Sequence, residues 1–350
     1  MNINETLLNK LVASAPSSVD YLRNYGCDGT DIKDFLLTSR DFDDRQNFAI
    51  NIIERIFGYH GKEDLIRHIV RLAKIEKGIQ ELQPWQRDHV VHALICFILG
   101  IFINEKWMPI KVDVFEWKLA CLLHDICYPA EFAFNILTSI PDDIKQIAID
   151  INCPKPAVKA TTKIEGLENL NNNLDGLDLI QSRVNSWGLK IDVRKEYHSM
   201  QDGRPCHGMY SALAALFVLD MMYQKKNPLR EYRDIRGDEP YLSWNQKYFE
   251  GTILNACSAI FLHNLPTSYF SLQKINRHNA PTAFLLKLCD SLQEWERPSK
   301  NNQAGEPASN FDITITTRGL ELSANVSSSK ATKMTNEING ALEVNDVLIT

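Results

Sequence analysis

The sequence predicts a mainly α-helical fold that ends in a small ββαβ unit, and three observations support this. From residue 1 to about residue 300, apolar side chains mostly recur three and four positions apart, which is the spacing of one helix face. Five of these periodic stretches are long enough to be core helices. Beyond about residue 310 the period becomes two, which is typical of strands.

The five expected core helices are separated by residues that end helices. Asn104, Pro129, "KKNP" at 225–228, "NLP" at 264–266 and "RP" at 297–298 provide these breaks. The expected helices cover residues 90–103, 114–126, 208–223, 251–264 and 280–295. They indicate one helical domain over residues 85–298, against which an N-terminal helical segment, residues 1–84, is expected to pack.

Two stretches interrupt the helical pattern. Residues 152–175 are rich in Asn, Pro and Lys, so a long insertion near 152–200 is expected to run over the surface, and residues 299–310 resemble a linker. Residues 311–350 then predict a hairpin about Arg318 and Gly319, a helix and a last strand. This tail contains no histidine, so it is expected to pack beside the helical body without supplying a metal ligand.

Composition narrows the classes of partner. The 350 residues carry a formal net charge of −6 and no Lys/Arg-rich run, so no duplex nucleic acid is expected. The longest apolar run, 93–103, is too short to span a bilayer, and the N-terminus lacks a signal peptide, which together predict a cytoplasmic protein without a membrane partner. Eight scattered cysteines without a CxxC motif indicate reduced core thiols. A homo-oligomer stays open.

Each expected core helix carries an isolated histidine or aspartate in apolar surroundings. A single histidine of this kind is usually a hydrogen-bonded core residue, but five such helices in one domain favour a metal site. Imidazole suits Zn, Fe, Ni and Co, and carboxylates also suit Mn and Mg. The candidates, in chain order, are His89 and His92, His124 and Asp125, His207, His263, and Asp290.

The adjacent pair His124 and Asp125 is the centre of the predicted site. Neighbouring residues on a helix point roughly 100° apart, so both side chains are expected to flank one ion. The Asp125 carboxylate can then bridge to a second ion about 3.5–4 Å away, the separation typical of two-metal hydrolases.

This ordered set resembles the HD superfamily of metal-dependent phosphohydrolases over residues 85–297. His92, the His124-Asp125 doublet and Asp290 match that family's ligand set, and His207 and His263 match the additional histidines of its two-metal members. The stretches "RDHVVHAL", "CHGMYSALAAL" and "LCDSLQEWERP" are similar to those of bacterial HD domain proteins. The resemblance therefore implies a helical HD-domain bundle. No "GYP" follows the HD doublet, which argues against the cyclic-dinucleotide branch.

The resemblance implies a phosphodiesterase or nucleotidase that cleaves a nucleotide or other phosphorylated small molecule with a metal-activated water. It implies a divalent transition metal, two ions being favoured, from Mn, Fe, Co or Zn, with Mg also in range. In the mononuclear alternative, His207 and His263 contact the substrate phosphate. Two other functions stay open: a non-catalytic nucleotide-sensing HD module in a signalling or defence system, and a helical scaffold with buried histidines.

The resemblance also suggests roles around the ions. Asp125 is expected to orient the attacking hydroxide, and His89 to protonate the leaving oxygen, with His198 as the alternative donor. His89 and His92 share a helix face; His92 is the expected ligand because it opens the apolar part of the helix, and the reverse assignment stays open.

Arg87, Arg204 and His198 are the expected substrate-binding residues. Arginine can bind a phosphate, but Arg204 could simply be solvated, and Arg87 and Asp88 could simply form the first turn of a helix.

Overall fold

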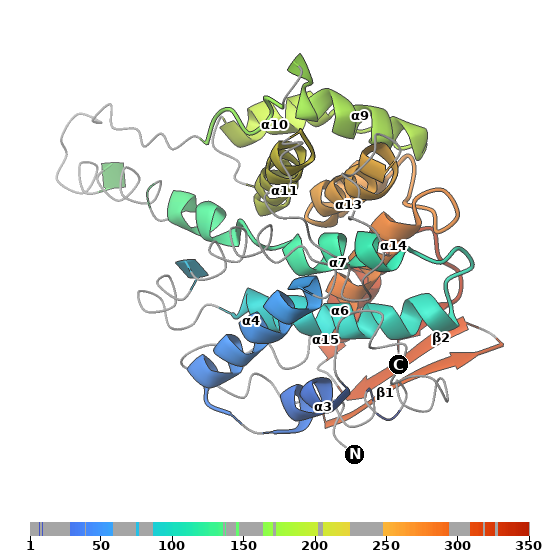
Figure 1. The fold of residues 1–350 in the computed structure, drawn as a ribbon. Coiled ribbons are helices and arrows are strands. Elements are labelled where there is room, and N and C mark those ends of the chain that lie inside the picture. Colours follow the sequence, from blue (N-terminus) through green and yellow to red (C-terminus); the bar gives the residue numbers. More distant parts are fainter. Residues whose placement is uncertain are drawn as a thin grey trace, which may run out of the picture.

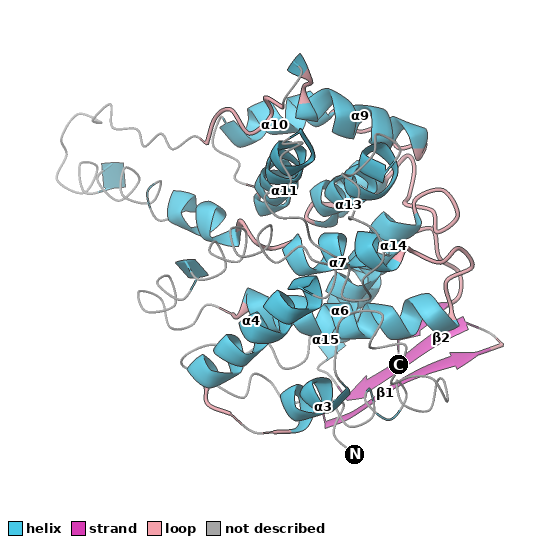
Figure 2. Ribbon diagram, viewed as in Figure 1, coloured by secondary structure: helices cyan, strands magenta, loops and turns pink. Residues whose placement is uncertain are grey.

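The computed structural model describes most of the helical body and the tail. The residues described are 7, 9, 29–38, 40–58, 75–76, 87–135, 137, 145–146, 164–170, 173–201, 206–224, 248–293, 309–317, 319–325 and 328–349. Helices dominate among them, and the named strands form one small sheet near the C-terminal end (Figures 1 and 2). The predicted fold class, mainly α with a small α/β appendage, is confirmed.

All five predicted core helices are present. They are α6 (His89–Lys106), α7 (Val114–Leu123), α11 (His207–Gln224), α13 (Leu254–His263) and α14 (Pro281–Leu292). A π-helical turn, η2 (Phe249–Ile253), leads directly into α13, and a 3-10 turn, η3 (Thr267–Phe270), follows it.

Helix α6 lies at the centre of the body, where α4, α7 and α14 pack against it (Figure 1). Its residues 89–104 are all buried, so it lacks the polar face of a surface helix. The Asp88 carboxylate caps it by accepting the Val91 N–H at 2.8 Å. Helix α6 is long and apolar enough to cross a membrane, but 89% of that window is buried inside the protein, as expected of a core helix.

A glycine allows α6 and α7 to approach closely. A Cβ on Gly100 would lie 1.9 Å from the Trp117 ring, which occupies that space and is fully buried. The indole Nε1 also donates to the Phe97 carbonyl at 3.1 Å. A mid-helix glycine costs roughly 0.5–1 kcal/mol, and here it makes room for the Trp117 side chain. This contact fixes the distance between α6, which carries His92, and α7, which ends immediately before His124.

Helix α13 packs against α7, α9, α11 and α14. Its C-terminal end meets the N-terminal end of α11 at Gly208, where a Cβ would lie 3.0 Å from the Asn264 Cβ and 3.2 Å from the His263 ring. The absence of a side chain at Gly208 therefore lets His207 and His263 face each other.

The N-terminal segment contributes α3 (Gly29–Leu37) and α4 (Phe42–Gly58) to the described structure. Helix α4 contacts both α6 and α7. The buried Lys118 ammonium donates to the Ile56 carbonyl at 3.3 Å, near the C-terminal end of α4, where a positive charge is favourable. Helix α4 is thereby held beside the two central helices.

The region expected to be a surface excursion contains two helices, α9 (Gly176–Ser186) and α10 (Val193–Gln201), which cover α11 and α13 at the top of Figure 1. Asp175 caps α9 by accepting the Leu177 N–H at 2.8 Å. Leu177, Ile180 and Val184 form its buried face. Residues 152–163 of the predicted excursion lie outside the described part of the chain.

The tail forms the predicted ββαβ unit from β1 (Ser309–Thr316), β2 (Gly319–Asn325), α15 (Ser328–Ala341) and β3 (Val347–Ile349). Strand β2 is central, antiparallel to β1 and parallel to β3. Helix α15 contacts α14 and η3 of the body. Of the predicted linker, 299–308 lie outside the described residues, and 309–310 belong to β1.

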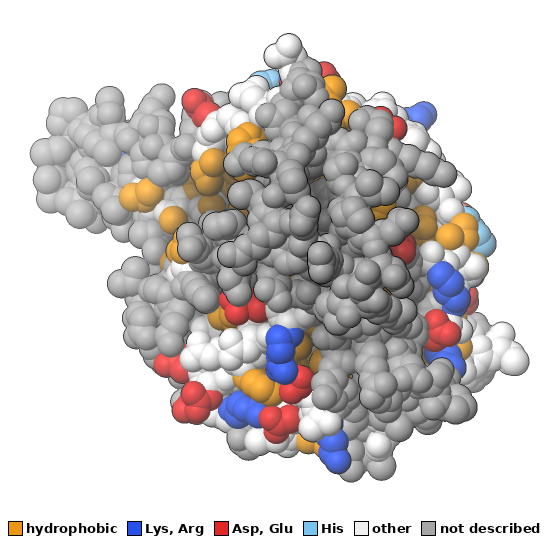
Figure 3. All heavy atoms as spheres, viewed as in Figure 1, with side chains coloured by type: hydrophobic (Ala, Val, Ile, Leu, Met, Phe, Trp, Pro, Cys, Tyr) orange, Lys and Arg blue, Asp and Glu red, His pale blue; other side chains and the backbone are white. Residues whose placement is uncertain are grey.

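On the face shown in Figure 3, the described acidic and basic side chains are interspersed. No extended area of one charge gathers among the described residues that this view exposes.

Candidate metal centre

His124 and Asp125 lie in a turn after α7, which corrects the expectation that both are on the helix. Helix α7 ends at Leu123, the Ile126 N–H then donates to the Leu123 carbonyl at 3.3 Å, and the next described helical residues are 128–135. Pro129 explains the break. In a continuous helix its ring would clash with the Asp125 carbonyl, whereas a proline fits the first turn of a new helix.

The turn places Asp125 between two pairs of buried or nearly buried histidines. Its Oδ1 lies 3.1 Å from the His207 Nε2 and 3.2 Å from the His263 Nε2. Its Oδ2 lies 3.3 Å from the His124 Nε2 and 3.9 Å from the His92 Nε2. These side chains form two groups that share Asp125, each with all its ligand atoms within 4.8 Å of one another. The buried His/Asp cluster could hold a metal ion.

Asp290 joins the first group from α14. Its Oδ1 lies 3.1 Å from the His92 Nε2, although the two residues are 198 positions apart in the sequence. The Asp290 side chain is 24% exposed, so it lies at the edge of an otherwise buried cluster. The six residues proposed as ligands from the sequence are thus brought together by the fold.

Two of the four histidines are held by the backbone of their own segment. The Nδ1 of His124 bonds the Cys121 carbonyl at 2.6 Å, and the Nδ1 of His263 bonds the Ile260 carbonyl at 2.5 Å. A carbonyl can only accept, so each Nδ1 carries a proton, and in the neutral imidazole Nε2 is then the nitrogen that can bind a metal ion. Both Nε2 atoms face Asp125.

The other two histidines are held by side chains from elsewhere in the fold. The Nδ1 of His92 bonds the amide oxygen of Gln293, at the end of α14. The Nδ1 of His207 bonds the Glu131 carboxylate at 2.7 Å, and the same oxygen accepts the His207 backbone N–H. Metal-binding histidines commonly donate their second nitrogen to a carbonyl or carboxylate in this way.

The distances fit a metal ion. Two ligand atoms that each lie about 2.1 Å from one ion are roughly 3.0–3.4 Å apart at octahedral to tetrahedral angles, and three of the four Asp125 to histidine distances are 3.1–3.3 Å. The His124 Nε2 is buried and has no hydrogen-bond partner. Such an atom is costly unless something binds it, and a cation at this position would bind it.

The electrostatics keep the carboxylates charged. Burial would raise the pKa of Asp125, but His124, His207 and His263 outweigh it and hold that pKa well below its usual value. Burial would likewise raise the pKa of Asp290, and the neighbouring imidazoles, His92 foremost, lower it instead. Two ionised carboxylates among imidazoles suit a divalent cation.

The two histidines that face Asp125 Oδ1 differ in charge preference. Burial together with the neighbouring His124 and His207 lowers the pKa of His263, despite its contact with Asp125. Burial also disfavours the charged form of His207, but its bonds to Asp125 and Glu131 outweigh this and raise its pKa to about 10. The two pKa values shift in opposite directions because Glu131 bonds His207 and not His263.

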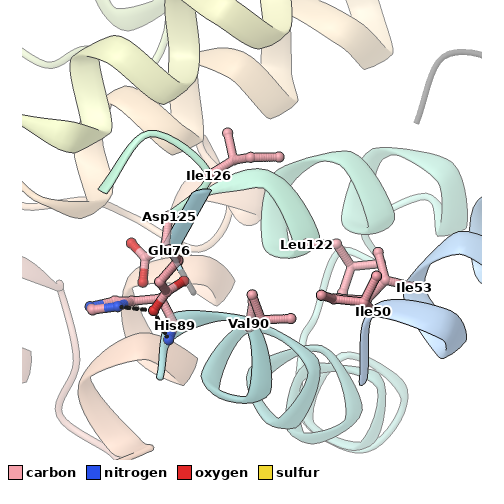
Figure 4. Close-up of a pocket in the computed structure, with 9 residues that line it drawn as sticks. Ile50, Ile53, Glu76, His89, Val90, Leu122, Asp125 and Ile126 are labelled. Atoms are coloured by element: carbon pink, nitrogen blue, oxygen red, sulfur yellow. Dashed lines mark hydrogen bonds and ion pairs between the residues drawn. The ribbon is translucent and has the colours of Figure 1, made fainter. Parts of the chain in front are cut away.

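His89 lies outside both ligand groups. Its Nδ1 is 2.9 Å from the Glu76 Oε1, and its backbone N–H donates to the same oxygen at 2.8 Å. Its ring stacks on Tyr128, with 3.6 Å between centroids. Figure 4 shows His89, Glu76 and Asp125 at the same end of a cavity. The fold therefore places His92 among the candidate ligands, whereas His89 lies beside them and lines the cavity.

Of the residues expected to bind substrate, the structure describes Arg87 and His198, and both are exposed and outside the two ligand groups. Arg87 is exposed immediately before α6, and the sequence's alternative reading of Asp88 as a helix-capping acid agrees with its bond to Val91. His198 is exposed on α10, where its ring contacts Tyr197. Arg204 lies outside the described residues.

Glu76, Glu131 and Gln293 are the functional candidates that sequence reasoning missed. Gln293 follows the ligand Asp290 by three positions and therefore shares a helix face with it, which was an available signal. Glu76 stands in ordinary polar surroundings and Glu131 among alanine and phenylalanine residues, and only the fold brings each of them to a histidine.

No family model, curated protein or solved structure matches this chain. The geometry of the cluster is therefore the basis for assigning a function.

Proposed function

We propose that the protein is a metal-dependent phosphohydrolase of the HD type that acts on a nucleotide or other phosphorylated small molecule. The observation that carries this proposal is that two histidine pairs face the two different oxygens of Asp125. A carboxylate shared in this way is the expected bridge of a two-metal hydrolase, whose ions lie about 3.5–4 Å apart.

The ligand sets follow from the two groups. His92, His124, Asp125 and Asp290 would hold one ion, and Asp125, His207 and His263 the second. The mixture of imidazole and carboxylate suits Mn, Fe, Co or Zn, with Mg less favoured by the histidines. When bound, such ions lower the pKa of a water and stabilise the charge that develops on the phosphate.

The chain's own residues would supply the remaining chemistry. Asp125 orients the attacking water through its position between the two histidine pairs. His89 is the proton donor to the leaving oxygen. Its Nδ1 is engaged by Glu76, so its Nε2 is the nitrogen available to the substrate.

Metal analysis of purified, Mn-loaded protein tests the ligand sets. Wild type should hold two equivalents, His207→Ala or His263→Ala about one, and Asp125→Ala none, because its carboxylate serves both positions. His278→Ala is the control, since His278 is exposed and outside the cluster. One equivalent in both wild type and His263→Ala would contradict the two-ion arrangement and favour substrate-binding histidines.

Hydrolysis of bis(p-nitrophenyl) phosphate, followed by a panel of nucleotides, tests the reaction. Mn-loaded wild type should cleave the aryl ester, and Asp125→Ala should not. A protein that holds its full metal content and hydrolyses none of these esters would contradict a phosphohydrolase and favour a nucleotide-sensing module.

A further inference from the structure

The cavity beside Asp125 has a polar end and an apolar end. Asp125, Glu76 and His89 lie together at one end, and the side chains of Ile50 and Ile53 approach from α4 at the other (Figure 4). The polar end coincides with the cluster, because Asp125 belongs to both. A substrate whose phosphate lies at Asp125 therefore has an apolar recess within its reach.

The apolar end is aliphatic. Val90 from α6, Leu122 from α7 and Ile126 from the turn line the cavity together with the two α4 isoleucines. Among the described residues that line it, only Glu76, His89 and Asp125 carry a hydrogen-bonding side chain. A hydroxyl or amide placed at this end would lose its bonds to water without replacement, so the recess favours carbon over oxygen or nitrogen.

The size of the cavity limits the occupant. Its volume is about 30 Å³, and a single water needs at least roughly 10–15 Å³ by the same measure. This volume matches a chain of a few carbon atoms. Helices α4, α6 and α7 all contribute to its wall, so its dimensions are set by the packing of the N-terminal segment on the body.

We propose that this cavity is a subsite for a short aliphatic group, about two to four carbons long, esterified to the phosphate that the cluster binds. This inference rests on the proposed function. His89 lies at the polar end beside Asp125, where the ester oxygen of a bound phosphate ester would lie. Hydrolysis breaks the phosphorus–oxygen bond of the ester, and the hydroxide of the attacking water joins phosphorus while the water's other proton passes to solvent. The alcohol leaves with a proton from His89, which solvent then reprotonates, and with its carbon chain in the recess.

Binding of n-alkylphosphonates, from methyl to hexyl, tests the subsite without turnover, because hydrolysis cannot remove their phosphorus–carbon bond. Calorimetry with Mn-loaded wild type should show affinity rising about fourfold for each added methylene while the chain still fits, and falling beyond about four carbons. Ile53→Ala removes three carbons from the wall, so the preferred chain should become about three carbons longer.

Ile52→Ala is the matched control. Ile52 is a buried isoleucine of the same helix that does not line the cavity, so its loss should leave the preferred chain length unchanged. Manganese-dependent binding that is equal for all chain lengths overturns the subsite and leaves the proposed function standing. No binding of any phosphonate to Mn-loaded wild type overturns both. If a variant does not fold, the dependence of the wild-type affinity on alkyl chain length still tests the subsite.

Discussion

The four histidines of the cluster differ in what holds their Nδ1 atoms. His124 and His263 use a carbonyl three residues earlier, so the local backbone sets their orientation. His92 and His207 depend on Gln293 and Glu131, which come from other elements. A substitution at either of these two partners should therefore affect one histidine and leave the others in place.

Gln293→Leu should weaken Mn²⁺ binding at the His92 position roughly 10–100-fold, the usual effect of removing such a hydrogen-bond partner. The leucine fills the space but leaves the His92 Nδ1–H without an acceptor, so the ring loses its fixed tautomer and orientation. Titration calorimetry with Mn²⁺ measures the change. Ser258→Ala is the control, because the buried Ser258 hydroxyl has no hydrogen-bond partner. Unchanged affinity in Gln293→Leu would show that Gln293 does not orient His92.

Among the elements, α7, α13 and α14 meet at one buried carboxyl group. Glu116 on α7 accepts the Thr282 hydroxyl of α14 and, at 3.3 Å, the Asn255 amide of α13. Burial raises its pKa from the usual 4.5 to about 7, although both hydrogen bonds favour the charged form. The junction of the three helices therefore depends on pH.

The folded chain holds the Glu116 proton more tightly than the unfolded chain does. The contribution of Glu116 to the free energy of unfolding is therefore greatest below about pH 4.5, falls as the pH rises to about 7, and is reduced by on the order of 3 kcal/mol above it. Glu116→Gln should remove this loss, because a neutral amide needs no deprotonation and can donate to the unpartnered Asn255 Oδ1. The variant should be more stable than wild type at pH 8.

Urea unfolding at pH 5 and pH 8 measures this difference for wild type, Glu116→Gln and the control Glu105→Gln, whose side chain is exposed on α6. The same pH dependence in Glu116→Gln as in wild type would assign it to other groups.

For the whole molecule, the tail and the helical body meet without sharing the metal ligands. The apolar side chains of the tail, Ile313, Leu320 and Leu322 of the sheet and Met334 of α15, are nearly fully buried and continue the hydrophobic core of the helical body. The clustered ligands come from α6, the turn after α7, α11, α13 and α14. Because none of these ligands belongs to the tail, we expect that a substitution that loosens the tail leaves the metal content unchanged.

Gly319→Ala tests this separation in the full chain. Gly319 has φ +134°, and a Cβ there would lie 2.0 Å from the Asp346 carbonyl oxygen, so an alanine strains the hairpin and pushes β2 away from the segment before β3. Amide hydrogen exchange should quicken in residues 309–349, while Mn content stays at the wild-type value. Gly251→Ala is the control, since nothing lies within 4 Å of its added Cβ. Loss of metal from folded Gly319→Ala protein would show that the tail supports the cluster.

The sequence by itself determined the features that depend on local periodicity and residue type. The three-and-four spacing of apolar residues was sufficient to predict α6, α7, α11, α13 and α14, and the change to alternation was sufficient for the tail. It also selected His92, His124, Asp125, His207, His263 and Asp290, because ionisable side chains within apolar helices need partners. Helix α9 was missed although Asp175 and the spacing of its apolar residues signalled it.

Only the tertiary structure decided how these residues meet. The assignment of each Asp125 oxygen to a different histidine pair, and the partners Glu76, Glu131 and Gln293, depend on contacts between separate segments of the chain. The aliphatic recess likewise exists because α4 packs on α6 and α7. A local pattern specifies which face of a helix is buried, but the crossing of helices sets the distances between their side chains, and those distances define the site.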